Sequence, residues 1–266
     1  QDRIRYDAER RTTKADPTGR DLPLLRTEKT TLATRKIRRI HYAMFAQLPI
    51  KLLDCQFHPP GVSAELMIVE GDSASTAVGI TRDSSYQAVL PIQGKPLNAW
   101  KATRAKVASN EFYSAITQAI GAGWDDTFCL EKARYQHVVL IFDPDADGIH
   151  CSMLVLMFFY RWMRPLLDSG RILLVRPPLF EINAPHFTDT LCAETDEQAV
   201  AHVERLRLEG YQDITKKRFR GLASMGNAIL SKYCVNPESR HVFSMRAEDA
   251  VAAIRAFSPN IPIEKS

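Results

Sequence analysis

The stretch "VVLIFDPDADGIH", residues 138–150, decides the fold of this chain. Five apolar residues lead directly into three aspartates at alternate positions, Asp143, Asp145 and Asp147, and Gly148 follows them. Two unit charges about 5 Å apart at an effective dielectric constant of about 20 repel by roughly 3 kcal/mol. A bound cation is the usual reason why such a cluster is tolerated. The pattern therefore predicts a buried strand that ends at a cation site.

Outward from this stretch, strands alternate with helices. We expect apolar strands at 64–71, 86–94, 137–143 and 171–182, the last broken by Pro177-Pro178, and helices between them at 73–80, 109–123 and 149–167. Such alternation implies βαβ units in a doubly wound, mostly parallel four-stranded α/β sheet flanked by helices. Continuous apolar strands indicate burial on both faces of the sheet.

Three parts are expected along the chain. Residues 1–60 predict a basic N-terminal arm and linker, with a basic helix at 32–48 and a boundary at "HPPG". Residues 61–183 hold the alternating strands and helices. Residues 184–266 predict a mainly helical C-terminal tail, with helices at 196–210, after the basic stretch "KKRFRG" and at 246–257. Ser109 or Asn110 is expected to cap the helix at 109–123, and Gly121 or Gly123 to end it.

Composition limits the classes of function. No apolar run reaches the roughly 20 residues that span a bilayer, so no membrane contact is expected. The cysteines form no CxxC pair, and their odd number indicates reduced thiols in the cytoplasm; they are Cys55, Cys129, Cys151, Cys192 and Cys234. Residues 1–51 hold 13 Lys/Arg against six Asp/Glu, a net charge of +7, whereas the rest carries −3. A basic arm fits a polyanion partner, or else a solvated terminal segment.

Four carboxylates are the candidate functional group. Glu70 ends the strand at 64–71, as Asp143, Asp145 and Asp147 end the strand at 137–143. Sites in open α/β sheets form beyond the carboxyl ends of strands, so the four acids converge if these strands are neighbours. Oxygen ligands alone suit Mg²⁺, whose coordination is often completed by substrate phosphates. This arrangement is typical of phosphoryl transfer.

Three other interpretations of "DPDADG" compete with this one. An EF-hand loop needs a Glu at its twelfth position, where this chain has Leu154, and a preceding helix rather than a strand. The metal loop of phosphohexomutases is similar, but the serine phosphate-carrier loop of those enzymes is not found. An Asp-rich turn could cap the next helix, although one aspartate explains a cap and three do not.

Several motifs in order resemble a known family. They are "KLLDC" (51–55), "ELMIVEGDSAS" (65–75), "AVLPIQGKPLNAWKA" (88–102), "FDPDADGIH" (142–150), "RPPLFEI" (176–182), "RFRGLASM" (218–225) and "NPESR" (236–240). Together they closely resemble the Toprim region and tail of the B subunits of bacterial type IIA DNA topoisomerases, DNA gyrase and topoisomerase IV. The resemblance covers roughly residues 50–257. It implies a Toprim domain at 61–183 and a topoisomerase B-type tail at 184–266.

The resemblance implies a mechanism. The family cleaves and reseals both DNA strands through a tyrosine on the A-type partner, and the Toprim acids hold Mg²⁺ at the scissile phosphate. Glu70 would be a metal ligand and an acid/base near the 3′ oxygen. Asp143 and Asp145 would be the main catalytic metal ligands, and Asp147 would complete the site. One or two Mg²⁺ ions are implied, with Mn²⁺ as a substitute.

Further residues and partners follow from the same resemblance. Asp72, Lys95 and Asn98 would line the DNA cleavage site, and Arg220 would contact the DNA backbone. His150 matches the family's "DG-x-H". The implied partners are double-stranded DNA and a tyrosine-bearing A-type subunit in an A2B2 heterotetramer associated with the nucleoid. ATP would act through a domain that is not in this chain, on the same full-length chain or on a separate one.

The sequence also departs from the family pattern. Ser75 and Thr76 replace two glycines, Pro144 replaces an alanine, and "RGLASM" stands where "KGLGEM" is usual. None of these changes removes one of the four acids. They indicate a divergent member, and two alternatives stay open: a DNA-binding or assembly module that keeps the fold without catalysis, and a free-standing Toprim nuclease or primase-like protein.

Overall fold

The computed structural model describes residues 48–58 and 63–258. The basic arm, and the helix expected at 32–48 apart from its last residue, lie outside the described residues. The described part belongs to one compact unit, which begins at Gln47.

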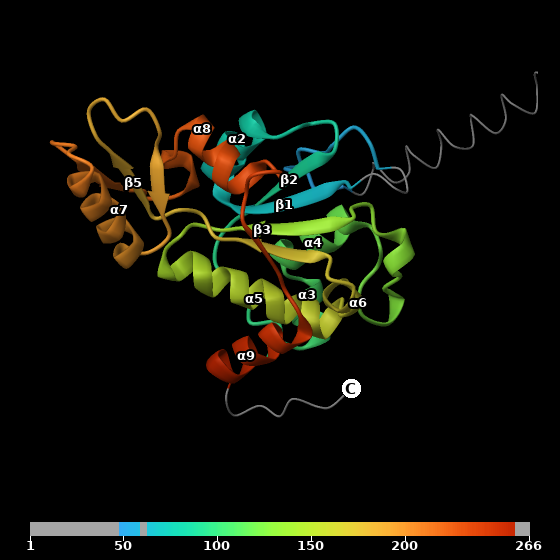
Figure 1. Cartoon of the computed structure of the whole chain (residues 1–266). Coiled ribbons are helices and arrows are strands. Elements are labelled where there is room, and N and C mark those ends of the chain that lie inside the picture. The colour runs from blue at the N-terminus through green and yellow to red at the C-terminus, as the bar shows by residue number, and fades with distance from the viewer. Residues whose placement is uncertain (1–47, 59–62, 259–266) are drawn as a thin grey trace, which may run out of the picture. The chain divides into compact units, whose positions relative to one another are not determined.

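A five-stranded sheet forms the centre of this unit (Figure 1). Its order is β2 (Gln87–Ile92), β1 (Glu65–Glu70), β3 (His137–Ile141), β4 (Ile172–Val175) and β8 (Val242–Ser244). The first four strands pair in parallel, and β8 pairs with β4 in the antiparallel direction. The predicted mostly parallel sheet is thus confirmed, and the tail adds a fifth strand to its edge.

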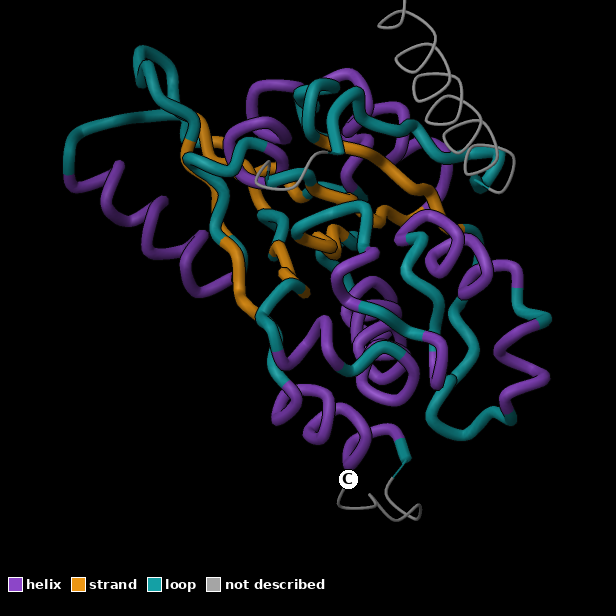
Figure 2. The backbone as a smooth tube through the Cα atoms, turned by 90° about the vertical axis from the view of Figure 1, so that its right-hand side faces the viewer, coloured by secondary structure: helices purple, strands orange, loops and turns teal. Residues whose placement is uncertain are grey.

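Helices cover both faces of the sheet (Figures 1 and 2). One face carries α2 (Gly71–Thr81), α8 (Asn227–Leu230) and a π-helical turn (Ser231–Val235). The other carries α3 (Arg104–Ala108), α4 (Glu111–Ile120), α5 (Ala146–Trp162), α6 (Pro165–Asp168) and α9 (Ala247–Phe257). Successive strand residues enter opposite cores because side chains alternate across a sheet: Leu66 and Ile68 face the second group of helices, and Met67 and Val69 the first.

Local signals explain where two helices begin and end. The Asn110 side chain accepts a hydrogen bond from the Tyr113 amide and caps α4, and Gly121 ends that helix in the left-handed conformation, as predicted. Helix α5 begins at Ala146, three residues earlier than expected, because the Asp145 side chain caps it by accepting a hydrogen bond from the Gly148 amide at 2.8 Å. The acidic loop is therefore shorter than the sequence pattern indicated.

The tail contains strands in addition to the expected helices. The break at Pro177-Pro178 separates β4 from β5 (Phe180–Asn183), which pairs with β6 (Leu191–Ala193) and β7 (Thr215–Arg218) in a second, antiparallel sheet. Helix α7 (Asp196–Leu208) packs on this sheet. Short 3₁₀ turns occupy Asp125–Thr127, Leu130–Lys132 and Leu222–Ser224. Strand β7 was missed because its sequence, TKKR, is exposed along its whole length and has no apolar alternation.

A buried ion pair ties the tail to the main sheet. Arg240 of "NPESR" donates to both carboxylate oxygens of Glu65 at the start of β1, and Gln87 donates to one of them at 2.8 Å. The side chains of Arg240 and Glu65 are 3% and 5% exposed. Breaking this pair would leave a charge without its counter-charge inside the protein, which is costly. The pair therefore links the tail to β1.

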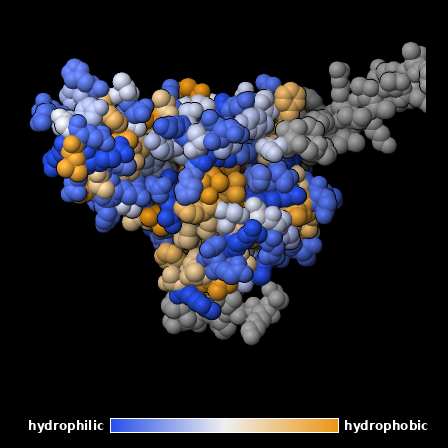
Figure 3. Space-filling model, viewed as in Figure 1, coloured by the Kyte–Doolittle hydropathy of each residue, from blue (hydrophilic) through white to orange (hydrophobic). Residues whose placement is uncertain are grey.

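The face of the molecule seen in Figure 3 is mostly polar. Figure 3 shows hydrophilic side chains over most of one face, with apolar ones gathered near its middle. None of the helices within residues 48–58 and 63–258 has the length and hydropathy needed to cross a bilayer.

Candidate active site

The carboxyl ends of β1 and β3 lie side by side. These strands are neighbours, and Val69 pairs with Ile141, so Glu70 and Asp143 leave the sheet at the same edge. Strand spacing of about 4.8 Å and a rise of about 3.3 Å per residue place their Cα atoms roughly 6 Å apart. The strand adjacency on which the predicted acidic site depends is therefore present.

The neighbouring acids influence the pKa values of Glu70 and Asp143. Burial raises the pKa of Glu70 above its usual value, and the negative charges of the three aspartates raise it further. The positive charge of Lys95 acts in the opposite direction. Burial also raises the pKa of Asp143, the Leu222 amide opposes that shift, and the charge of Asp145 adds to it. This edge of the sheet thus holds an excess of negative charge, which favours a cation.

The tail contacts Asp143 directly. The Leu222 amide donates a hydrogen bond to Asp143 Oδ1 at 2.9 Å. Gly221 lies against the same carboxylate, since a Cβ atom at Gly221 would stand 2.6 Å from Asp143 Oδ2. These two residues belong to "RFRGL", so the motif that the resemblance assigned to DNA contact also reaches an acid of the site.

Asp145 caps the helix that follows it. Its Oδ1 accepts the Gly148 amide hydrogen bond, and its side chain lies at the surface. Gly148 must be small, because a Cβ atom there would stand 2.1 Å from the Asp143 carbonyl oxygen. The interpretation of this stretch as a helix-capping turn therefore explains Asp145. It does not explain why Asp143 and Asp147 lie beside it.

Asp147 and Lys95 form an exposed ion pair. Lys95 Nζ lies 3.1 Å from Asp147 Oδ1, and their side chains are 53% and 78% exposed. Exposed pairs contribute about 0–1 kcal/mol to stability. Because the pair is weak, little free energy is lost when Lys95 binds a phosphate or Asp147 binds a cation instead.

Asp72, in the first turn of α2, is held by two residues that the sequence did not single out. Lys51 Nζ lies 2.8 Å from Asp72 Oδ2, and Gln93 donates to the same oxygen at 2.8 Å. Both come from motifs that carried the resemblance, "KLLDC" and "IQGKP". Only the fold brings them together, since Lys51 and Gln93 are 21 residues away from Asp72 on opposite sides.

The remaining candidates lie in different settings. The Asn98 side chain accepts from the Trp100 and Lys101 amides and donates to Ser258 Oγ at 3.1 Å, so its polar atoms stabilise a turn. His150 stacks on Phe257 of α9 with ring centroids 4.7 Å apart. Arg220 is exposed and immediately precedes the glycine that contacts Asp143. DNA contacts of Asn98 and Arg220 stay predictions.

The donor set fits a hydrated divalent cation. All four side chains offer oxygen atoms, which Mg²⁺ prefers. Within the described residues, no three of these carboxylates bring ligand atoms within 4.8 Å of one another. Mg²⁺ usually keeps several waters and uses one or two carboxylates together with phosphates. Such a hydrated ion does not require three carboxylates in direct contact with it.

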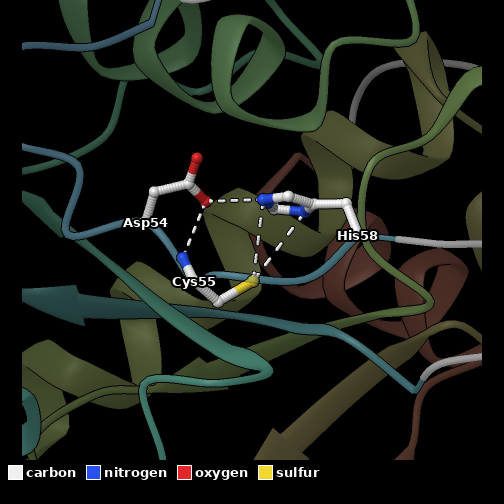
Figure 4. A group of neighbouring side chains, drawn as sticks. All are labelled: Asp54, Cys55 and His58. Carbon is white, nitrogen blue, oxygen red and sulfur yellow. Dashed lines mark hydrogen bonds and ion pairs between the residues drawn. The ribbon is translucent and has the colours of Figure 1, made fainter. Parts of the chain in front are cut away.

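A tighter group of potential ligands lies elsewhere, before β1. Asp54, Cys55 and His58 bring one ligand atom each within 4.8 Å (Figure 4). Asp54 Oδ1 already accepts the Tyr135 hydroxyl at 2.7 Å, and its Oδ2 is paired with Arg134. A metal ion would have to displace these donors and lie beside the guanidinium, so we interpret the group as a hydrogen-bond network.

A cleft of about 330 Å³ opens beside Asp143. The start of α5 and the end of β4 form two of its walls, and Glu194 and Thr195 of the tail form another. Asp143 therefore lines an open cleft and is not enclosed on every side by protein.

Comparisons with known proteins identify a family region within this chain. The model of the Toprim domain family matches residues 65–177. The DNA gyrase B subunit from Archaeoglobus fulgidus is 39% identical over 215 residues, which cover 81% of this chain and 33% of the relative. Its counterpart from Thermotoga maritima is 36% identical over 230 residues, covering 86% and 35%, and that from Thermus thermophilus is 36% identical over 241 residues, covering 88% and 37%.

The chain thus spans about a third of the length of the curated relatives it matches. The matched family region begins at the first residue of β1 and ends just after β4, and it contains Glu70 and the three aspartates. Residues 65–177 are therefore a Toprim domain, and the chain is a homologue of part of the DNA gyrase B subunit.

Proposed function

We propose that this chain is the Mg²⁺-binding Toprim part of a type IIA DNA topoisomerase, a B-type subunit that acts with a tyrosine-bearing A-type subunit. The observation that carries the proposal is that β1 and β3, which lead to Glu70 and Asp143, are neighbours in the sheet, in a chain homologous to the gyrase B subunit. The reaction would be double-strand DNA cleavage and religation.

In this proposal, residues of this chain bind the cation and transfer a proton during DNA cleavage. The partner's tyrosine, as its phenolate, would attack the scissile phosphorus, and the bond from phosphorus to the 3′ oxygen would break. A bound Mg²⁺ supplies positive charge that stabilises the phosphate in the transition state. Glu70, whose pKa is raised by burial and by the aspartates, would give a proton to the departing 3′ oxygen and take it back during religation.

The surrounding residues would position the DNA. Lys95 pairs with Asp147. Its ammonium group could instead bind a DNA phosphate. Arg220 lies on the turn that contacts Asp143, and Asp72 is fixed by Lys51 and Gln93. ATP hydrolysis and the A2B2 assembly would depend on domains and subunits beyond this chain.

A reconstitution experiment tests the proposal. The chain is mixed with a cognate A-type subunit, Mg²⁺ and supercoiled DNA, and covalent protein–DNA complexes are trapped with detergent. We expect linear DNA that is covalently attached to the A-type subunit. Chelation of Mg²⁺ before the detergent is added should allow religation and remove this product. If DNA is bound but never cleaved, the chain is a binding or assembly module. Cleavage without the A-type subunit would indicate a Toprim nuclease instead.

A further inference from the structure

The turn Arg220–Ser224 of the tail closes on an acid of the candidate site. Its Leu222 amide donates to Asp143 Oδ1 at 2.9 Å, and Gly221 is buried against Asp143 Oδ2. Gly221 has a φ of 161°, an extended conformation open to any residue. A side chain here would therefore have to displace the carboxylate, because its Cβ atom would stand 2.6 Å from Asp143 Oδ2.

The turn is anchored in the same core as the strand ends. Leu222 is fully buried and packs in one cluster with Val69 and Ile141, the paired residues at the ends of β1 and β3. Met225, at the end of the turn, belongs to that cluster too. The turn is therefore packed against the strands that lead to the acids.

The Ser224 side chain stabilises the turn through two hydrogen bonds to its backbone. Its hydroxyl accepts the Arg220 amide hydrogen bond at 3.0 Å and donates to the Gly221 carbonyl at 2.7 Å. Ser224 is one of the positions at which "RGLASM" departs from the family pattern. The serine found at this position thus joins the two ends of the turn by hydrogen bonds.

We propose that the Gly221–Leu222 turn positions Asp143 and so sets the affinity of the acidic site for its divalent cation. The inference rests on the proposed function. Gly221, Leu222 and Ser224 are positioning residues: they act through Asp143. Hydrogen-bonding partners of metal ligands typically change metal affinity by about 10- to 100-fold when they are removed.

The test measures Mn²⁺ binding to the full chain by electron paramagnetic resonance, with Mg²⁺ as competitor. Gly221→Ala pushes a methyl group against Asp143, so we expect binding to be about 10- to 100-fold weaker. Ser224→Ala removes one brace and adds no atom, so a smaller loss is expected. Gly226→Ala is the matched control, because Gly226 lies on the same segment, is exposed and has nothing within 4 Å of an added Cβ atom.

A second readout separates positioning from general damage. If the turn positions Asp143, excess cation restores DNA cleavage by Gly221→Ala together with an A-type subunit. Unchanged Mn²⁺ binding in both Gly221→Ala and Ser224→Ala would overturn the inference, and so would a folded Gly221→Ala protein that excess cation fails to restore. If Gly221→Ala does not fold, Ser224→Ala decides alone. Equal Mn²⁺ binding by the unchanged chain and by Asp145→Asn would instead overturn the proposed function.

Discussion

Asp145 combines two tasks at one side chain. It caps α5 through its hydrogen bond with Gly148, and its charge raises the pKa of both Glu70 and Asp143. The cap needs only a hydrogen-bond acceptor, whereas the candidate cation site needs the charge. Different substitutions can therefore remove one task and keep the other.

The stability of two Asp145 variants separates these tasks. Asparagine caps helices as well as aspartate does, whereas alanine at an N-cap costs about 1 kcal/mol. Without a divalent cation, Asp145→Asn should unfold at the same or a higher urea concentration than the unchanged chain, because a repulsive charge is removed. Asp145→Ala should be less stable by about 1 kcal/mol. A loss of stability in Asp145→Asn would show that the charge itself is structural.

His58 gives the protein a pH-dependent stability away from the acids. Burial disfavours its charged form, but hydrogen bonds to Asp54 and Cys55 outweigh burial and raise the pKa of His58 from 6.5 to about 9. A raised histidine pKa stabilises the folded state fully below the unfolded value and loses that effect as the pH rises through the folded value.

The free energy of unfolding should therefore fall between pH 6.5 and about 9. The fall from this group is at most about 3 kcal/mol, from 1.36 kcal/mol per pKa unit. Denaturant titrations across that pH range measure it, with His58→Gln as the comparison. If His58→Gln keeps the same slope, the ion pair with Asp54 does not form in solution.

Among the elements, those of the main sheet were the easiest to predict. Apolar runs that end in Gly, Pro or acids predicted β1 to β4, because a strand buried on both faces must be apolar throughout. Strands β7 and β8 carry no such pattern: β7 is fully exposed, and β8 has only three residues. Their pairing partners, 32 or more residues away, decide their conformation.

Contacts between residues far apart in the sequence were also the part of the candidate site that could not be predicted. The four acids could be found because each follows an apolar strand. The contact of Leu222 with Asp143 spans 79 residues, and no local pattern encodes it. The resemblance had marked "RFRGL" as functional, but its contact with an acid required the fold.

The Glu65–Arg240 pair allows a test of how the tail is attached. Arg240→Met leaves Glu65 buried without its partner, which should cost about 3–5 kcal/mol in the free energy of unfolding. Changing both residues to apolar ones of similar size should recover much of that loss. Lys216→Met is the control, because the Lys216–Asp196 pair is exposed and is worth about 1 kcal/mol or less. Equal costs for the two single variants would contradict the assigned role.

At the scale of the whole molecule, the basic arm is the part whose role depends most on a partner. Residues 26–39 hold six cations, which are Arg26, Lys29, Arg35, Lys36, Arg38 and Arg39. If they contact phosphates, DNA affinity should fall with salt at a log–log slope of about −0.9 per contact. Deleting residues 1–40 should flatten that slope. An unchanged slope would assign the arm to another task.

The central claim is that the acids hold a divalent cation against a scissile phosphate. The measurement that tests it most directly is the yield of covalent cleavage complexes from Asp145→Asn, reconstituted with an A-type subunit, Mg²⁺ and supercoiled DNA. The helix cap survives this change, so a loss can be attributed to the charge. We predict that cleavage falls by about 100-fold or more while DNA binding is unchanged. Cleavage at the rate of the unchanged chain would contradict the account.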